Sequence, residues 1–513
     1  MRLSAKRFVV SLPRNRWLVL FAVLLAFVPI VIDMTILHIA VPSLTLALGA
    51  SGTEILWIID IYPLMMAGLL VPMGTLADRL GHRRTLLIGL AVFLVASVIA
   101  AFAPTAAVLI GARVLLAVGA SMVMPNVLAI IRQTFDDPRE RGLALGLWGT
   151  IGSAGAALGP LAGGALLEHF WWGSVFLINV PVMLLVWPLA YATLPRRQPT
   201  AGGNWTIGQA LVLLVGLIAT VYAIKSGFKA GNSPIITGAT LLAGLTLLAW
   251  FVRQQRRSAT PMLDLTLFGK PAITMGMVMA IVVSGALAGV ELTVAQELQF
   301  VVGYSPLEAG LFMMPLVVAS AIGGPLAGCV TGVLGLRMVA TLSLLVAAGS
   351  LAGLGLSDFH NPGLGVIALM ATLGLSLSIG LTASSIAIMG SAPADKAGAA
   401  GALEGTGYEL GAGLGITLFG VLLSASYASA IRLPAELAGT LPSSASHSIG
   451  ETMTAADRFG DAGAALAAAG RAAFSDAHAM VLLTAATLIG VLAMVVFVAL
   501  RNYRETAVAS TAH

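Results

Sequence analysis

Long apolar runs follow one another along nearly the whole chain, separated by short stretches of Gly, Pro and charged residues. A helix needs roughly 20 apolar residues to cross the hydrocarbon core of a bilayer, and these runs predict about fourteen such helices. The expected spans lie near residues 17–41, 54–76, 84–103, 105–131, 141–167, 173–194, 206–226, 235–252, 272–298, 306–333, 337–357, 363–389, 397–426 and 478–500. The sequence therefore predicts an all-α integral membrane protein.

The positions of the basic residues test this count. Cytoplasmic loops of membrane proteins carry an excess of Lys and Arg, so a missed helix would scramble the alternation of basic loops. Most of the 27 basic residues fall on one expected side, in the loops around residues 2–16, 79–84, 132–141, 196–197, 253–270, 337, 396 and 501–504. The other side receives Lys225, Lys229, Arg432, Arg458 and Arg471, and Arg113 falls inside a span. We therefore expect both termini on the cytoplasmic side of the membrane.

The spans divide as six, two and six, with polar stretches around the middle pair. We expect a six-helix bundle over residues 1–195, a two-helix insertion over 196–270 and a second six-helix bundle over 271–513. Two such bundles commonly hold a substrate between them near the membrane midplane. The segment 428–477 is too polar to span and is expected outside the cell, with a short surface helix around 455–473.

Composition agrees with this picture and limits the chemistry. Hydrophobic residues make up 58% of the 513 residues and charged residues only 10%, against about 25% charged in soluble domains. One cysteine, Cys329, excludes an intrachain disulfide. The sequence contains no G-x-x-x-x-G-K-[ST] phosphate loop, no H-E-x-x-H and no metal-spaced Cys/His set. We expect no cofactor, no metal, no nucleic-acid partner and no enzymatic activity. We also expect that membrane lipid surrounds the protein and that the protein is a monomer.

The loop after the second expected span reads GTLADRLGHRR over residues 74–84. Gly74 and Gly81 permit a sharp reversal of the chain, and Asp78 can pair with neighbouring cations such as Arg79 or lie at a helix N-terminus. A simple positive-inside anchor would explain the arginines but not this carboxylate between glycines.

This loop closely resembles the signature between helices two and three of the major facilitator superfamily, with His82 where the family usually has a basic residue. The resemblance implies the major facilitator fold of two six-helix bundles, here with two extra central helices. It also implies that Gly74, Asp78, Arg79 and Gly81 form a cytoplasmic latch between the bundles.

Two further segments resemble signatures of the same superfamily. Residues 113–119, RVLLAVG, resemble its membrane arginine motif, and residues 155–164, GAALGPLAGG, resemble the motif that marks its antiporters. Small residues four apart let helices approach closely, and a proline inside a helix permits a kink. The antiporter motif comprises Gly155, Gly159, Pro160, Gly163 and Gly164.

The first two spans carry the resemblance further. Residues 33–42, DMTILHIAVP, and residues 57–62, WIIDIY, resemble the fourteen-helix drug:proton antiporters, in particular efflux pumps for quaternary ammonium compounds and methyl viologen. The resemblance extends over essentially the whole chain, and export rather than uptake rests on it.

Ionisable residues inside spans are costly, by at least roughly 2.5–3.5 kcal/mol each on insertion scales, so each one needs a reason. At 1.5 Å per residue, Asp33, Asp60 and Arg113 share a depth of roughly 9–12 Å below the outer ends of their spans. A cluster of these three residues is expected, and a static ion pair between helices is the alternative. For Glu291, an interfacial position is an equally good interpretation.

The thirteenth expected span contains two further acids, in GALEGTGYELG over residues 401–411. Glu404 and Glu409 are five positions apart, about 140° around a helix, and should have different partners. The resemblance implies that acids of this helix serve cation recognition and coupling. We expect proton coupling at Asp33, Glu409 and Arg113, and substrate cations at Asp60, Glu404, Trp57 and Tyr408, although packing is the commoner role of a single membrane aromatic.

These observations predict an alternating-access antiporter that exports lipophilic cationic drugs and antiseptics in exchange for protons. The alternatives are a transporter of the same fold that imports a metabolite, a membrane enzyme and a non-transporting receptor. The scattered acids within spans do not resemble the nucleophile or metal constellation that an enzyme requires.

Overall fold

The computed structural model describes residues 15–195, 207–227, 233–258, 261–393, 396–433 and 446–502, and these residues contain helices and no strand. The α-helices are α1 Arg16–Leu48, α2 Gly52–Leu80, α3 His82–Ala101, α4 Ala106–Thr134, α5 Pro138–His169, α6 Ser174–Leu177, α7 Asn179–Thr193, α8 Ile207–Gly227, α9 Pro234–Arg257, α10 Pro271–Gln296, α11 Pro306–Leu334, α12 Leu336–Gly355, α13 Leu364–Ser391, α14 Ala397–Ala430, α15 Ile449–Ala456 and α16 Gly460–Ala499. Short helical turns η1 Leu265–Gly269, η2 Glu297–Val302 and η6 Leu500–Asn502 complete them. The expected all-α membrane fold is confirmed.

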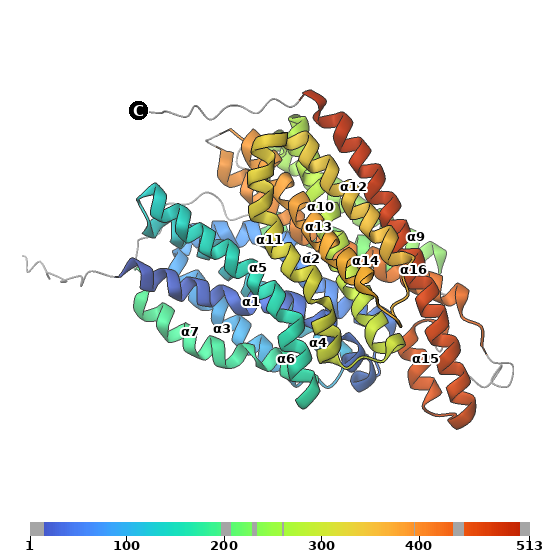
Figure 1. Cartoon of the computed structure of the whole chain (residues 1–513). Coiled ribbons are helices and arrows are strands. Elements are labelled where there is room, and N and C mark those ends of the chain that lie inside the picture. The colour runs from blue at the N-terminus through green and yellow to red at the C-terminus, as the bar shows by residue number, and fades with distance from the viewer. Residues whose placement is uncertain are drawn as a thin grey trace, which may run out of the picture.

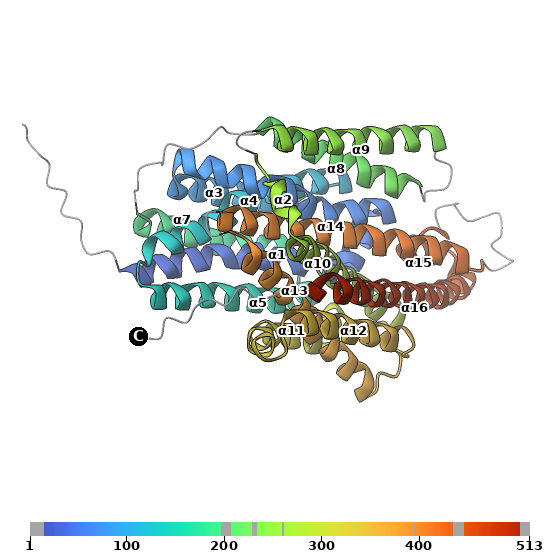
Figure 2. The same cartoon turned by 90° about the horizontal axis from the view of Figure 1, so that it is seen from above.

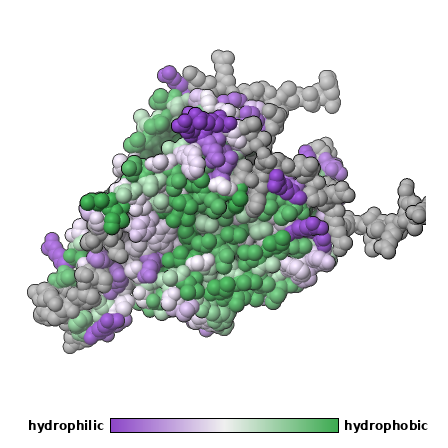
Figure 3. Space-filling view, turned by 180° about the vertical axis from the view of Figure 1, so that it is seen from behind, coloured by the Kyte–Doolittle hydropathy of each residue, from purple (hydrophilic) through white to green (hydrophobic). Residues whose placement is uncertain are grey.

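Thirteen helical segments of the described residues are long and apolar enough to cross a membrane. The remaining expected span is α5, which is rich in Gly and Ala and packs against α1 and α11. Large apolar side chains such as Ile235, Val333 and Leu364 lie more than 80% exposed. Figure 3 shows a broad apolar surface with hydrophilic residues gathered toward its margins. This surface suits contact with lipid tails.

Two large apolar cores organise the helices. One core is formed mainly by α1 to α7, with Ile416 and Val421 of α14 joining it, and the other mainly by α10 to α13 and α16. The hairpin of α8 and α9 lies at one edge of the molecule, and its inner helix α8 touches α2 and α14 (Figure 2). We call the helices α1–α7 the N-half and α10–α16 the C-half.

The two halves repeat one local plan. Helix α2 begins with a capping box of Ser51 and Glu54 and ends at Gly81, whose φ is 91°. Helix α11 begins with the same box from Ser305 and Glu308 and also ends at a positive-φ glycine. A capping box satisfies two backbone N–H groups at a helix start, and glycine adopts positive φ without a steric penalty. The repeat places α2 and α11 at corresponding positions.

The two faces of the molecule differ. Figure 1 shows the helices of the two halves diverging toward the face where α1 begins and α16 ends. We call this the terminal face, and we call the face that carries α15 the outer face. At the terminal face the ion pair Arg16–Glu140 stays within the N-half, and Lys396 before α14 pairs with Asp264, which lies just before η1 and α10.

The C-terminal region differs from the sequence expectation. The segment 428–477 was expected to be a loop before a last span of 478–500, but α16 is one continuous helix of 40 residues that begins at Gly460. Helix α15 precedes it and packs on it. The stretch 460–477 is rich in Ala, which has the highest helix propensity, so the last span extends outward. Residues 434–445 lie outside the described part.

Candidate functional site: buried charges between the two halves

An ion pair joins α1 to α4 within the N-half. The Arg113 guanidinium donates to Asp33 at 2.5 Å, and both side chains are at most 2% exposed. Arg113 also donates to the carbonyl oxygen of Ile58 on α2 at 3.1 Å and lies 4.5 Å from the centre of the Tyr62 ring. The arginine therefore connects α1, α2 and α4.

Asp60 does not join that pair, contrary to the expected cluster of three. Its carboxylate forms an ion pair with Lys225 of α8 at 2.7 Å and accepts a hydrogen bond from the Thr417 hydroxyl of α14 at 2.6 Å. Lys225 was expected at the end of the span 206–226, on the opposite side of the membrane from most basic residues. It lies two residues before the end of α8 and is 4% exposed. Its pairing with Asp60 was not expected. A buried carboxylate needs a counter-ion, and α8 brings one.

Trp57 lies directly beneath this lysine. The Lys225 Nζ is 3.8 Å from the centre of the Trp57 ring, which is a cation–π geometry. Two of the residues expected to bind a substrate cation, Asp60 and Trp57, thus already contact a cation of the chain itself.

Glu409 faces the N-half from α14. Its side chain is 3% exposed, and its Oε2 has no hydrogen-bond partner among the described residues. Helix α14 packs on α2 here, and a Cβ at Gly413, one turn along from Glu409, would lie 2.8 Å from Leu64 of α2. Glu409 lies within electrostatic reach of the Tyr62 hydroxyl, as do Asp33 and Arg113.

Glu404 lies on another side of α14, as its spacing from Glu409 predicts. The Tyr408 hydroxyl donates to Glu404 at 2.7 Å, one helical turn along, and lies 3.2 Å from the Leu381 carbonyl oxygen of α13. Glu404 and Tyr408 thus face the C-half helix α13, whereas Glu409 faces the N-half.

A histidine and a glutamate join the halves toward the outer face. His38 Nδ1 lies 3.1 Å from Glu291 Oε2, and neither residue is more than 7% exposed. The Gln299 side chain donates to the Ile39 carbonyl oxygen at 3.0 Å nearby. Glu291 is therefore buried between the halves and not at a lipid interface. His38 was not among the expected site residues, because its partner lies 253 positions away in the sequence.

The glycine-rich motif of α5 brings three helices together. A Cβ at Gly159 would collide with Thr35 of α1, and one at Gly163 would lie 2.7 Å from Ile36. On the neighbouring side, a Cβ at Gly164 would lie 2.6 Å from the Pro306 carbonyl oxygen of α11. Gly155 and Pro160 are also buried. Small residues here let α5 pack closely on both α1 and α11, and so connect the N-half to the C-half.

The loop between α2 and α3 lies at the terminal face. Gly81 supplies the positive-φ turn. Asp78 and Arg79 are exposed, and the Asp78 carboxylate lies 3.7 Å from His82, whose other ring nitrogen lies 2.7 Å from Asn126 of α4. A Cβ at Gly74 would lie 3.8 Å from Pro125, an ordinary contact. These contacts stay within the N-half.

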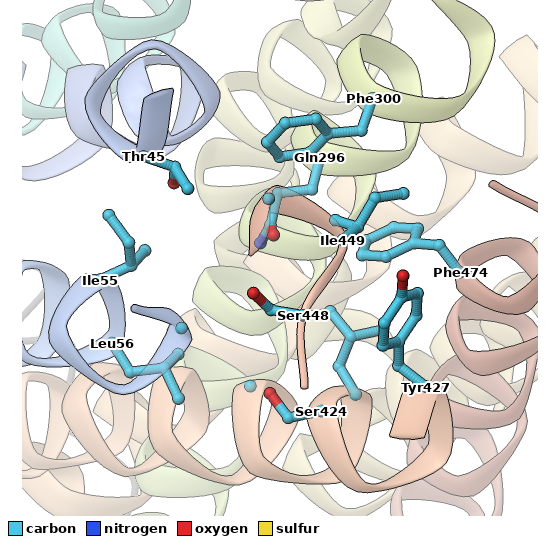
Figure 4. Close-up of a pocket in the computed structure, with 14 residues that line it drawn as sticks. Thr45, Ile55, Leu56, Gln296, Phe300, Ser424, Tyr427, Ser448, Ile449 and Phe474 are labelled. Carbon is cyan, nitrogen blue, oxygen red and sulfur yellow. The ribbon is translucent and has the colours of Figure 1, made fainter. Parts of the chain in front are cut away.

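The outer face closes over a small cavity of about 50 Å³. Its lining comes from both halves, including Thr45, Leu56, Gln296 and Tyr427 (Figure 4). The Tyr427 hydroxyl lies 2.5 Å from that of Thr452 on α15, so α15 is fixed over the outer ends of the helices.

Comparisons with known proteins agree with this geometry. The family model of the Major Facilitator Superfamily matches residues 23–416. The methyl viologen resistance protein SmvA of Salmonella typhimurium is 47% identical over 94% of this chain and 97% of its own length. The multidrug efflux pump LfrA of Mycolicibacterium smegmatis is 38% identical over 96% of this chain and 97% of its own.

Among solved structures, a bacterial homolog of the human lysosomal transporter Spinster has a similar fold. Its TM-score is 0.67 with 18% identity, over 95% of this chain and 98% of that one. The family match covers most of the chain, and the relatives span nearly all of it. The chain therefore belongs to the major facilitator superfamily.

Proposed function

We propose that this protein exports lipophilic cations in exchange for protons, by alternating access of a site between its two halves. The coarser statement needs no proposal, because relatives named as resistance and efflux proteins extend over nearly the whole chain. The chain is a multi-pass efflux transporter of small molecules and not an enzyme. Proton coupling, cationic substrates and orientation are the proposal.

Glu409 is the observation that supports coupling most directly. A buried carboxylate without a hydrogen-bond partner is costly when ionised, and protonation or a bound cation relieves that cost. Glu409 of the C-half lies within electrostatic reach of Tyr62, whose ring contacts Arg113 of the Asp33–Arg113 pair. A proton and a substrate cation would therefore compete for the same anionic position, which is the requirement for exchange.

The distribution of contacts supports alternating access. Contacts between the halves, such as His38–Glu291 and α5 against α11, lie toward the outer face, while neither of the terminal-face ion pairs Arg16–Glu140 and Lys396–Asp264 joins the N-half to the C-half. We propose that the terminal face is cytoplasmic in a bacterial inner membrane and that this conformation admits substrate from inside. The loop of Gly74, Asp78, Arg79 and Gly81 is the proposed latch that closes this face in the opposite conformation.

The proton motive force is sufficient to drive such an exchange. One charge moved across the membrane supplies about 2.3 kcal/mol per 100 mV. Each proton adds about 1.4 kcal/mol per unit of pH difference. No nucleotide is required.

The test measures accumulation of labelled tetraphenylphosphonium in cells that express the chain, with and without an uncoupler. Expression should lower accumulation, and the uncoupler should abolish the difference. Cells that express Glu409→Gln, which keeps the shape of the side chain, should accumulate as much tetraphenylphosphonium as cells without the transporter. The variant must be present in the membrane at the same abundance as the wild type. Unchanged accumulation with every lipophilic cation tested would refute export, and a difference that survives the uncoupler would refute proton coupling.

A further inference from the structure

Lys225 is the only buried lysine among the described residues, and it lies on a helix outside both six-helix groups. Helix α8 packs mainly on α9 and reaches the main body through α2, with a few contacts to α14. A Cβ at Gly68 of α2 would collide with Leu214 of α8, so the two helices approach closely there. Near the outer end of α8, the lysine extends into the main body.

The lysine occupies a position built for a cation. Its ammonium lies 2.7 Å from Asp60 Oδ2 and 3.8 Å from the centre of the Trp57 ring. Thr417 of the C-half completes the surroundings with a hydrogen bond to the same carboxylate oxygen. The other oxygen of Asp60, Oδ1, is buried and has no hydrogen-bond partner in the described part of the chain. A carboxylate beside an aromatic face is the chemistry that also recognises lipophilic ammonium and phosphonium ions.

We infer that Lys225 is a tethered competitor, which fills the cation site of Asp60 and Trp57 when the transporter is empty and leaves it when a lipophilic cation binds. This inference rests on the proposed function and identifies one place where its substrate binds. It gives the two-helix insertion a role that the six-helix halves do not supply.

The physical reason is the cost of an empty anionic site. A buried carboxylate that loses its only counter-ion strongly destabilises a protein, so a transporter that releases its substrate needs a replacement charge. Lysine suits this role because its ammonium is a compact charge on a flexible four-carbon stem. Thr417 of the C-half donates a hydrogen bond to the same carboxylate. An exchange of cations at Asp60 therefore changes the contact between α2 and α14.

Competition makes a quantitative prediction about affinity. When a site is free in only a fraction of the molecules, the apparent dissociation constant rises by the inverse of that fraction. Removal of the ammonium while the stem is kept should therefore strengthen binding of an external cation. A static ion pair that only holds α8 against α2 predicts unchanged or weaker binding, because Asp60 then never meets the substrate.

The experiment measures the dissociation constant of labelled tetraphenylphosphonium by equilibrium dialysis against the purified full-length protein in detergent. Lys225→Met should lower the dissociation constant by about tenfold or more, and Lys225→Arg should stay near the wild type because it keeps the charge. The matched control is Lys396→Met, which removes the lysine of the surface pair with Asp264 and should leave binding unchanged. Unchanged or weaker binding by folded Lys225→Met would overturn the inference.

A second variant covers the case in which Lys225→Met does not fold. The double change Asp60→Asn with Lys225→Met removes both charges, which buried pairs tolerate better than the loss of one partner. It should bind tetraphenylphosphonium at least about tenfold more weakly than Lys225→Met or the wild type, because the anion is gone. Wild-type affinity in this double variant would overturn the inference.

The outcomes separate this inference from the proposed function. If the wild type neither binds nor exports tetraphenylphosphonium, the tethered competitor is overturned, and export is overturned with it when every other lipophilic cation tested also accumulates unchanged. If the wild type exports the cation but the Lys225 variants bind it as the wild type does, export stands and the tethered competitor is refuted.

Discussion

Asp33 and Glu409 were expected to play similar parts in coupling, but their surroundings predict opposite effects on stability. Asp33 pairs with Arg113 at 2.5 Å in a site that is almost fully buried. Glu409 has an oxygen without a hydrogen-bond partner. Asp33→Asn therefore leaves a buried cation without its counter-ion, whereas Glu409→Gln removes a charge that no hydrogen bond compensates.

The size of the difference follows from the contacts that remain. The loss of one partner of a buried ion pair costs about 3–5 kcal/mol. After Asp33→Asn, Arg113 keeps the Ile58 carbonyl oxygen at 3.1 Å and the Tyr62 ring at 4.5 Å, and the new amide oxygen still accepts from it. We therefore expect Asp33→Asn to lower the free energy of unfolding by about 3 kcal/mol, the lower end of that range. Glu409→Gln should change stability by less than about 1 kcal/mol, because it breaks no hydrogen bond of the Oε2 atom.

The assay combines unfolding of the purified proteins in detergent with proton release on addition of tetraphenylphosphonium in weakly buffered solution. Glu409→Gln should unfold like the wild type and release no proton. Asp33→Asn should unfold at a much lower temperature than the wild type. The double variant Asp33→Asn with Arg113→Gln should recover much of the lost stability, because no unpaired charge remains. Equal stability of the two single variants would refute this interpretation of the Asp33–Arg113 pair. Undiminished proton release by Glu409→Gln would remove Glu409 from the coupling mechanism.

Three further predictions concern packing, the latch and orientation. Gly159→Ala should destabilise the protein by roughly 1–3 kcal/mol in an unfolding assay and impair transport, because its Cβ would collide with α1. The matched change Gly152→Ala on the same helix meets only an ordinary contact at 3.5 Å and should be tolerated, so equal effects would contradict the close packing. Asp78→Ala should slow transport at normal membrane abundance, since the carboxylate is exposed and not needed for folding, and normal turnover would reduce the loop to an anchor. After the native cysteine is replaced, cysteines at Asp136 and Asp358 should react with impermeant reagents from opposite sides of the membrane, and labelling from one side would overturn the orientation of the helices.

The sequence by itself determined the membrane class and most of the helices. Apolar length is a local property, and a backbone in lipid must satisfy its own hydrogen bonds, so each run of sufficient length becomes a helix. The glycine-rich segment of α5 could also be interpreted locally, because residues without large side chains permit close packing wherever their helix lies. Local patterns could not reveal that Gly164 meets α11 while Gly159 meets α1.

Pairings between distant buried charges were decided by the tertiary structure alone. Depth along each span placed Asp33, Asp60 and Arg113 at one level, but depth does not give the rotation of a helix or its neighbours. Helix α8 brings Lys225 to Asp60 from 165 positions along the chain, and α10 brings Glu291 to His38 from 253 positions along it. A charge near the end of an apolar run fits a loop as well as a helix until packing supplies its partner. The burial of Lys225 is therefore a property of the assembled helices and cannot be read from its own segment.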